Sequence, residues 1–150
     1  MFCVIPMHEY AHAWMAYKMG DKSIKLRGRL TMNPLAHIDP VGAIMIALIG
    51  FGWGRPTPVD ERNFKDPRKG IALTALAGPV ANLLLGFVLL FIATAFYSLS
   101  GIVETILGVA IYNFLYISAQ ITIYLAVLNL IPIPGFDGFS VLDFDHSNTC

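Results

Sequence analysis

The stretch His8-Glu9-Tyr10-Ala11-His12 determines how this chain is interpreted, because it places two imidazoles and a carboxylate in apolar surroundings. Residues 1–19 are mostly apolar, and Gly20 follows them, which predicts a helix that ends there. Residues four positions apart share one face of a helix, so His8 and His12 can bind a single Zn²⁺ while Glu9 reaches a water on the metal. The alternative is a pair of buried histidines without a metal, although such side chains are costly inside an apolar helix unless they serve a function.

The composition is that of a membrane protein rather than of a soluble domain. Of 150 residues, enough for one domain, 56% are hydrophobic and 13% are charged, against about 45–50% and about 25% in a typical soluble domain. All 10 Lys and Arg residues lie between positions 18 and 69, and Glu104 is the only charged residue between positions 71 and 136. Lipid can surround so long an uncharged stretch. This pattern argues against a disordered chain, a coiled coil and a nucleic-acid-binding protein.

Two long apolar segments, 71–99 and 105–131, are each long enough to cross a bilayer as a helix. A helix needs about 20 residues to cross a bilayer. The uncharged run 41–51 is shorter than this, and it predicts a re-entrant or hairpin element. Between positions 23 and 31, apolar and cationic residues alternate, which predicts a small β-strand. We therefore expect an all-α helical bundle over residues 1–150, forming a single membrane-embedded domain with a small β element near the cytoplasmic face.

The basic segments 18–29 and 55–69 set the expected orientation, because Lys and Arg accumulate on the cytoplasmic side of membrane proteins. From there the chain crosses outward through 71–99 and returns through 105–131. The return brings residues 132–138 to the leaflet in which the histidine-bearing helix ends. We expect a multi-pass protein of the cell membrane whose active site faces the cytoplasmic leaflet.

A catalytic zinc ion requires a third protein ligand and one open position. Asp137 is the best placed, since Pro132 and Pro134 enforce extended backbone before it and the topology returns it to the correct leaflet. A carboxylate would also offset the charge that two neutral imidazoles leave on Zn²⁺. The alternative is an ordinary surface turn around Asp137. The other residues considered as ligands are His37, Asp39, Glu104, Asp143, Asp145 and His146, of which Glu104 falls at the far surface.

Several motifs follow one another along the chain: His8-Glu9-Tyr10-Ala11-His12, Asn33-Pro34-Leu35-Ala36-His37-Ile38-Asp39-Pro40, Gly52-Trp53-Gly54-Arg55-Pro56-Thr57-Pro58-Val59, Ala77-Gly78-Pro79-Val80-Ala81-Asn82 and Asn129-Leu130-Ile131-Pro132-Ile133-Pro134-Gly135-Phe136-Asp137-Gly138. Together they resemble the site-2 protease family of intramembrane zinc metalloproteases, in its compact branch without a PDZ insert. The resemblance covers about residues 5–142. Family members usually carry more membrane-spanning sequence before the first motif and a further helix after the last, so we expect this chain to be truncated at both ends.

The resemblance implies a zinc-dependent endopeptidase that hydrolyses peptide bonds in or near transmembrane segments of substrate proteins, as in regulated intramembrane proteolysis. It implies that Asp137, in the last motif, is the third zinc ligand beside His8 and His12. The implied partners are a transmembrane protein substrate and the lipid bilayer, without nucleic acid. The sequence does not predict an oligomeric state.

In this interpretation Glu9 takes a proton from the zinc-bound water and later donates it to the leaving amine. Asn82 is a candidate to hydrogen-bond the developing oxyanion or the substrate backbone, although an asparagine in a membrane helix can equally pair with a neighbouring helix. Gly78 and Pro79, one turn earlier, would loosen that helix and let another group approach. The edge of the expected strand 23–31 would hold an unwound substrate through backbone hydrogen bonds, or its basic side chains would contact anionic headgroups.

Three further residues have secondary roles in this scheme. His37 and Asp39 are either outer partners of the metal site or caps of the element that begins at Pro40. Asn129 would hold the loop that carries Asp137.

Two other functions are compatible with parts of the sequence. A membrane zinc-binding or transport protein should carry His and carboxylate residues on several crossing helices, but the segments 71–99 and 105–131 contain none. An inactive family member that acts as a membrane scaffold would fit the short ends of the chain, but the intact Glu9 argues against it.

Overall fold

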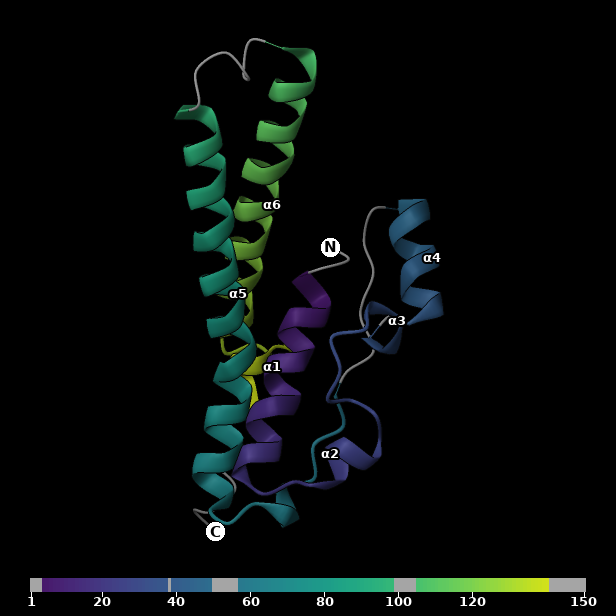
Figure 1. Ribbon diagram of the computed structural model, residues 1–150. Coiled ribbons are helices and arrows are strands. Elements are labelled where there is room, and N and C mark those ends of the chain that lie inside the picture. The colour runs from purple at the N-terminus through teal and green to yellow at the C-terminus, as the bar shows by residue number, and fades with distance from the viewer. Residues whose placement is uncertain (1–3, 38, 50–56, 99–104, 141–150) are drawn as a thin grey trace.

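The computed structural model describes residues 4–37, 39–49, 57–98 and 105–140, and within these ranges the chain forms helices and turns without a β-strand (Figure 1). The helices are α1 (Val4–Met19), α2 (Ser23–Leu26), α3 (Pro34–His37), α4 (Pro40–Ile49), the short 3₁₀ helix η1 (Glu61–Asn63), α5 (Pro67–Ser98) and α6 (Ile106–Leu130). The predicted helical character is therefore confirmed for these residues, and the predicted β element is wrong.

The segment predicted as a strand, 23–31, forms helix α2 and a turn. Its backbone hydrogen bonds are local, because Arg27 N–H donates to the Ser23 carbonyl at 2.9 Å. The apolar residues of the segment do not share one face either, since Ile24 is fully buried whereas Leu26 is 89% exposed. The described part of the chain thus offers no strand edge to which a substrate could add.

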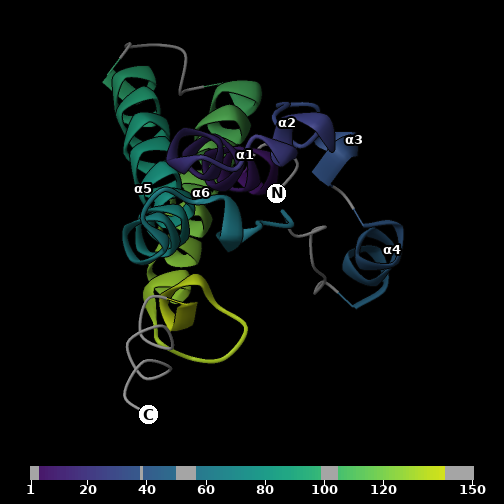
Figure 2. The same cartoon turned by 90° about the horizontal axis from the view of Figure 1, so that it is seen from below.

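The uncharged run predicted as a re-entrant or hairpin element contains helix α4, which lies apart from α1, α5 and α6 in two perpendicular views (Figures 1 and 2). Asp39 caps this helix, because its Oδ1 accepts a hydrogen bond from Gly42 N at 2.9 Å. The capping alternative for Asp39 is confirmed. The structure does not support the re-entrant or hairpin arrangement, and residues 50–56 lie outside the described ranges.

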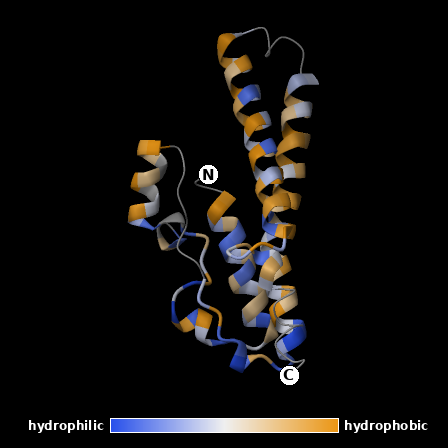
Figure 3. Ribbon diagram, turned by 180° about the vertical axis from the view of Figure 1, so that it is seen from behind, coloured by the Kyte–Doolittle hydropathy of each residue, from blue (hydrophilic) through white to orange (hydrophobic). Residues whose placement is uncertain are grey.

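Helices α5 and α6 form a long antiparallel pair, and α1 packs against the beginning of α5 (Figure 1). Two helices, α5 and α6, are long and apolar enough to cross a membrane, and Phe87, Phe91 and Phe114 are among their exposed side chains. Figure 3 shows hydrophobic residues predominating along this pair and hydrophilic residues gathering around α2. These features are consistent with a membrane protein. The buried core where α1, α2 and α5 meet consists of Ala13, Ala16, Ile24, Phe64 and Ile71.

The buried carboxylate of Asp21 fixes the segment 57–66 to the end of α1. Its Oδ1 accepts hydrogen bonds from Ser23 N (3.0 Å), Ser23 Oγ (2.6 Å) and Asn63 Nδ2 (3.0 Å), and its Oδ2 accepts one from Asp60 N (2.8 Å). Burial raises the pKa of Asp21, but these hydrogen bonds lower it by more, so that the net shift is downward. The connection holds this segment beside the histidines of α1.

Candidate metal centre

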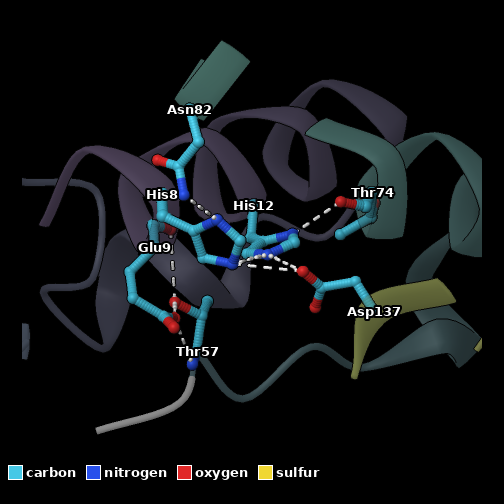
Figure 4. Close-up of polar contacts among 7 residues, drawn as sticks. All are labelled: His8, Glu9, His12, Thr57, Thr74, Asn82 and Asp137. Carbon is cyan, nitrogen blue, oxygen red and sulfur yellow. Dashed lines mark hydrogen bonds and ion pairs between the residues drawn. The ribbon is translucent and has the colours of Figure 1, made fainter. Parts of the chain in front are cut away.

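Three side chains from distant parts of the sequence converge at one point (Figure 4). His8 and His12 lie one turn apart on α1, and Asp137 lies in the turn that follows α6. Asp137 Oδ2 is 3.1 Å from His8 Nε2 and 3.3 Å from His12 Nε2, and the two Nε2 atoms are 2.9 Å apart. Donors that each lie about 2.0–2.2 Å from one ion in a tetrahedral arrangement are about 3.3–3.6 Å apart, slightly more than is observed here. The three atoms therefore lie close enough together to be ligands of a single metal ion.

The ionisation of Asp137 also suits a metal ligand. Burial alone would raise the pKa of Asp137, but the facing imidazoles of His12 and His8 lower it to about 2. Its Oδ2 is buried and forms no hydrogen bond within the described part of the chain. An ionised oxygen whose polar neighbours are two imidazole nitrogens is a natural ligand atom for a divalent cation.

Helix α5 orients the second imidazole. His12 Nδ1 lies 2.6 Å from the carbonyl oxygen of Thr74, to which it can only donate. In the neutral ring this places the proton on Nδ1 and leaves the lone pair on Nε2, the atom that faces Asp137. The backbone of α5 thereby fixes His12 in the tautomer that a metal ligand needs.

A glycine allows α5 to approach the two imidazoles this closely. A Cβ atom at Gly78 would lie 2.3 Å from His12 Nε2 and 2.5 Å from His8 Cε1, which is too close for any side chain. Pro79 follows and is fully buried inside the helix. The sequence predicted that Gly78 and Pro79 let another group approach, and the groups that approach Gly78 are the histidine rings.

The carboxylate of Glu9 is held by a residue to which the sequence had assigned no role. Glu9 Oε2 accepts hydrogen bonds from the backbone N–H of Thr57 at 2.9 Å and from its hydroxyl at 2.8 Å. Both bonds fall on the same oxygen, which leaves Glu9 Oε1 for another proton or donor. The only sequence signal for Thr57 was its place in a motif between two prolines, which says nothing about its partner.

A cavity of about 250 Å³ opens beside His12 and Asp137. One part of its wall is polar and includes Glu9, His12, Thr57 and Asp137, and another part is apolar and is formed by Val59, Phe64, Ile71 and Ala75. This volume is large enough for a water molecule together with a side chain of a bound peptide.

Asn82 lies one turn beyond Gly78 on α5 and is 2% exposed. Its Nδ2 is 3.2 Å from His8 Nδ1, on the side of the imidazole that faces away from Asp137 (Figure 4). The structure therefore places this predicted residue against the candidate metal centre, in contact with one of the ligands.

The other ligand candidates within the described ranges, His37 and Asp39, do not join this cluster. His37 is fully buried at a different place, with its Nε2 2.7 Å from the Thr31 carbonyl oxygen, and Asp39 caps α4. Asn129 lies near the end of α6, before the turn that carries Asp137. The remaining candidates, Glu104, Asp143, Asp145 and His146, lie outside the described residues.

No family model and no solved structure matches the chain. Several known proteins are similar to it in sequence. The chain is 42% identical over 137 residues to "Putative zinc metalloprotease YwhC" of Bacillus subtilis, a match that covers 91% of this chain and 63% of that protein. It is 35% identical over 142 residues to "Putative zinc metalloprotease Rip2" of Mycolicibacterium smegmatis, covering 91% and 52%, and 35% identical over 145 residues to the protein of the same name in Mycobacterium tuberculosis. The chain thus spans between about half and two thirds of the length of these relatives.

Each of these relatives is named "Putative zinc metalloprotease", and the convergence of His8, His12 and Asp137 provides ligands of the types that zinc binds. Zinc is therefore the metal that both lines of observation support. Two imidazoles and one carboxylate leave a fourth position open, as in zinc sites that act on a substrate.

Proposed function

We propose that this chain is the catalytic part of a zinc-dependent endopeptidase of the site-2 protease type, which hydrolyses peptide bonds in or near transmembrane segments of other proteins. The observation that carries the proposal is the convergence of His8, His12 and Asp137 next to a cavity that Glu9 also lines. Two long apolar helices beside this cluster support a location in the membrane.

In the proposed mechanism His8, His12 and Asp137 would hold the zinc ion. When bound, zinc would lower the pKa of a coordinated water to about 7 and polarise the carbonyl group of the substrate. Glu9 accepts a proton from the attacking water and transfers it to the nitrogen of the breaking peptide bond, so that one water is added across that bond. Thr57 keeps one oxygen of Glu9 occupied, and we expect the other to perform this transfer.

The walls of the cavity suggest what part of a substrate enters it. Val59, Phe64, Ile71 and Ala75 would contact an apolar side chain next to the bond that is cut. Most side chains of a transmembrane segment are of this kind. Because a helix hides its backbone, the segment must unwind locally before its carbonyl group can approach the metal.

The surroundings of the cluster support an active site in the cytoplasmic leaflet of a multi-pass membrane protein. Lys18 lies in the last turn of α1, and Arg68 and Lys69 lie in the first turn of α5, so basic residues flank the end of the bundle near the site. Lys and Arg in such flanking positions favour the cytoplasmic side.

Neither alternative function is favoured by a specific observation. A transporter needs metal ligands along a crossing path, yet α5 and α6 contain no His, Asp or Glu. An inactive scaffold has no need to hold a carboxylate beside the ligands, yet Glu9 is fixed by two hydrogen bonds.

Replacement of Glu9 by Gln tests the proposal. The change keeps the size of the side chain and the hydrogen bonds to one oxygen but removes the general base, so we expect cleavage of a model transmembrane substrate in detergent to fall by about 10²–10⁴-fold while zinc stays bound. Glu61→Gln is a matched control, because Glu61 lines the same cavity but is exposed and is not one of the three converging residues, and it should retain activity. Cleavage at the wild-type rate by the Glu9→Gln protein would refute the assignment.

A further inference from the structure

In the contact between Asn82 and His8, only one of the two polar atoms of the Asn82 amide group has a hydrogen-bond partner among the described residues. Asn82 Nδ2 faces His8 Nδ1 at 3.2 Å, and the amide oxygen of Asn82 is buried without a hydrogen-bond partner among the described residues. An amide nitrogen can only donate, so in this arrangement His8 Nδ1 must carry the lone pair. The proton of the neutral ring then sits on Nε2, the atom that faces Asp137.

That tautomer cannot serve a metal ion. A coordinating imidazole nitrogen needs its lone pair, which for His8 Nε2 requires the proton to be on Nδ1. His8 Nδ1–H in turn requires an acceptor, and the partner that it meets is the amide group of Asn82. The amide oxygen and nitrogen have nearly the same size and shape, so a half turn of the group exchanges them without repacking the helix.

We infer that Asn82 is a positioning residue for the metal centre: in the metal-loaded protein its Oδ1 accepts a hydrogen bond from His8 Nδ1–H and thereby holds His8 in the tautomer that binds zinc. The inference rests on the metal centre proposed above. It gives the buried Oδ1 a partner, and it moves the NH₂ group to the position where Oδ1 now lies.

The second histidine shows the same arrangement with a different acceptor. The outer nitrogen of His12 is bound by the carbonyl oxygen of Thr74, and the outer nitrogen of His8 faces Asn82, so α5 supplies the outer partners of both rings. A backbone carbonyl cannot change its character, whereas the amide of Asn82 can present either an acceptor or a donor. Asn82 therefore acts on the zinc affinity before any substrate arrives, which a group that binds only the oxyanion would not do.

Two variants of similar size separate the acceptor from the donor. Asn82→Leu fills the same space without polar atoms, and Asn82→Asp keeps an acceptor oxygen but loses the NH₂ group. We expect Asn82→Leu to weaken zinc binding by about 10–100-fold. Asn82→Asp should bind zinc either more tightly than the wild type or with a dissociation constant within a few-fold of the wild-type value. The measurement is the dissociation constant for zinc of the full chain in detergent, by competition with a chromogenic chelator and without substrate.

Control variants identify what each outcome means. Thr122→Val removes another buried polar group, whose hydroxyl donates to the Ser118 carbonyl of its own helix, and should leave the zinc affinity unchanged. If Asn82→Leu binds zinc as the wild type does, or if Asn82→Asp loses as much affinity as Asn82→Leu, the inference is wrong. His8→Ala separates this failure from that of the metal centre, because wild-type affinity in His8→Ala would refute the centre itself.

Discussion

The two halves of α5 differ both in composition and in what they contact. In the first half, 67–82, seven residues are buried, and these include Gly78 and Asn82 beside the histidines. In the second half, 83–98, only Gly86 and Ala93 are buried, and side chains such as Phe91 are exposed. The first half therefore builds the candidate site and the second half presents its surface to the surroundings. The first half carries Arg68, Lys69 and Asn82 among small residues, whereas the second half consists mostly of large apolar residues.

A glycine in each half makes the difference measurable. At Gly78 an added Cβ would meet ring atoms of His8 and His12, which are both fixed by hydrogen bonds to α5. At Gly86 it would meet Cγ1 of Ile123 at 2.5 Å, a partly exposed side chain of α6 that is not a proposed ligand. The same added carbon should thus lower the zinc affinity in the first half, whereas in the second half it should lower only the stability of the packed helices.

The largest effect is expected from Gly78→Ala. The imidazoles must move away from α5, which separates His12 from the Thr74 carbonyl and both rings from Asp137. Overpacking costs about 1–3 kcal/mol, so we expect the zinc affinity to fall by about tenfold or more and cleavage to fall with it. Zinc content after purification and the zinc dissociation constant measure this effect. Unchanged affinity would show that the close approach at Gly78 is not part of the metal centre.

The residues that meet at the first half of α5 could be predicted from the sequence better than the segments around them. The spacing of His8 and His12, the return of Asp137 and the position of Asn82 on an apolar helix each depend on local patterns or on the order of the crossings. Thr57 could not be recognised, because its bonds to Glu9 join residues 48 positions apart and arise only once the chain is folded.

The failed strand has a different cause. Residues 23–31 alternate as a strand does, but alternation predicts a strand only when one face is buried against a neighbour. Here Ile24 is buried in the core and Leu26 is 89% exposed, while Asp21 accepts hydrogen bonds from Ser23, the first residue of α2. A pattern of apolar residues does not reveal which of them will find a partner.

An intermediate effect is expected from Asp21→Asn, because Asp21 fixes the segment 57–66 to the end of α1. Both oxygens of Asp21 accept hydrogen bonds, including those from Asn63 and the backbone of Asp60, so an introduced NH₂ group would face a donor. One such buried mismatch costs about 1–3 kcal/mol of the free energy of unfolding. Thermal unfolding in detergent at neutral pH should show the loss.

The effect of Asp21→Asn should depend on pH. The pKa of Asp21 is lower in the folded chain than its ordinary value of 3.8, so the ionised group stabilises the fold above that value. This stabilisation is lost as the pH falls through the lower pKa of the folded state. The difference in stability between wild type and variant should therefore shrink at acidic pH, and a difference that grows there would contradict the role of the carboxylate.

The smallest effect is expected from Gly86→Ala, in the second half of α5. A modest loss of thermal stability from overpacking should accompany unchanged zinc affinity, because the side chain that must shift, Ile123, is not one of the proposed ligands. Ile123→Ala removes the obstructing atoms, so in that background Gly86→Ala should cost nothing, and a double-mutant cycle measures this coupling. No such relief exists at Gly78, where the obstructing atoms belong to the proposed zinc ligands. If Gly86→Ala lowered the zinc affinity, the two halves would not be separate, because packing between α5 and α6 would then control the position of the ligands.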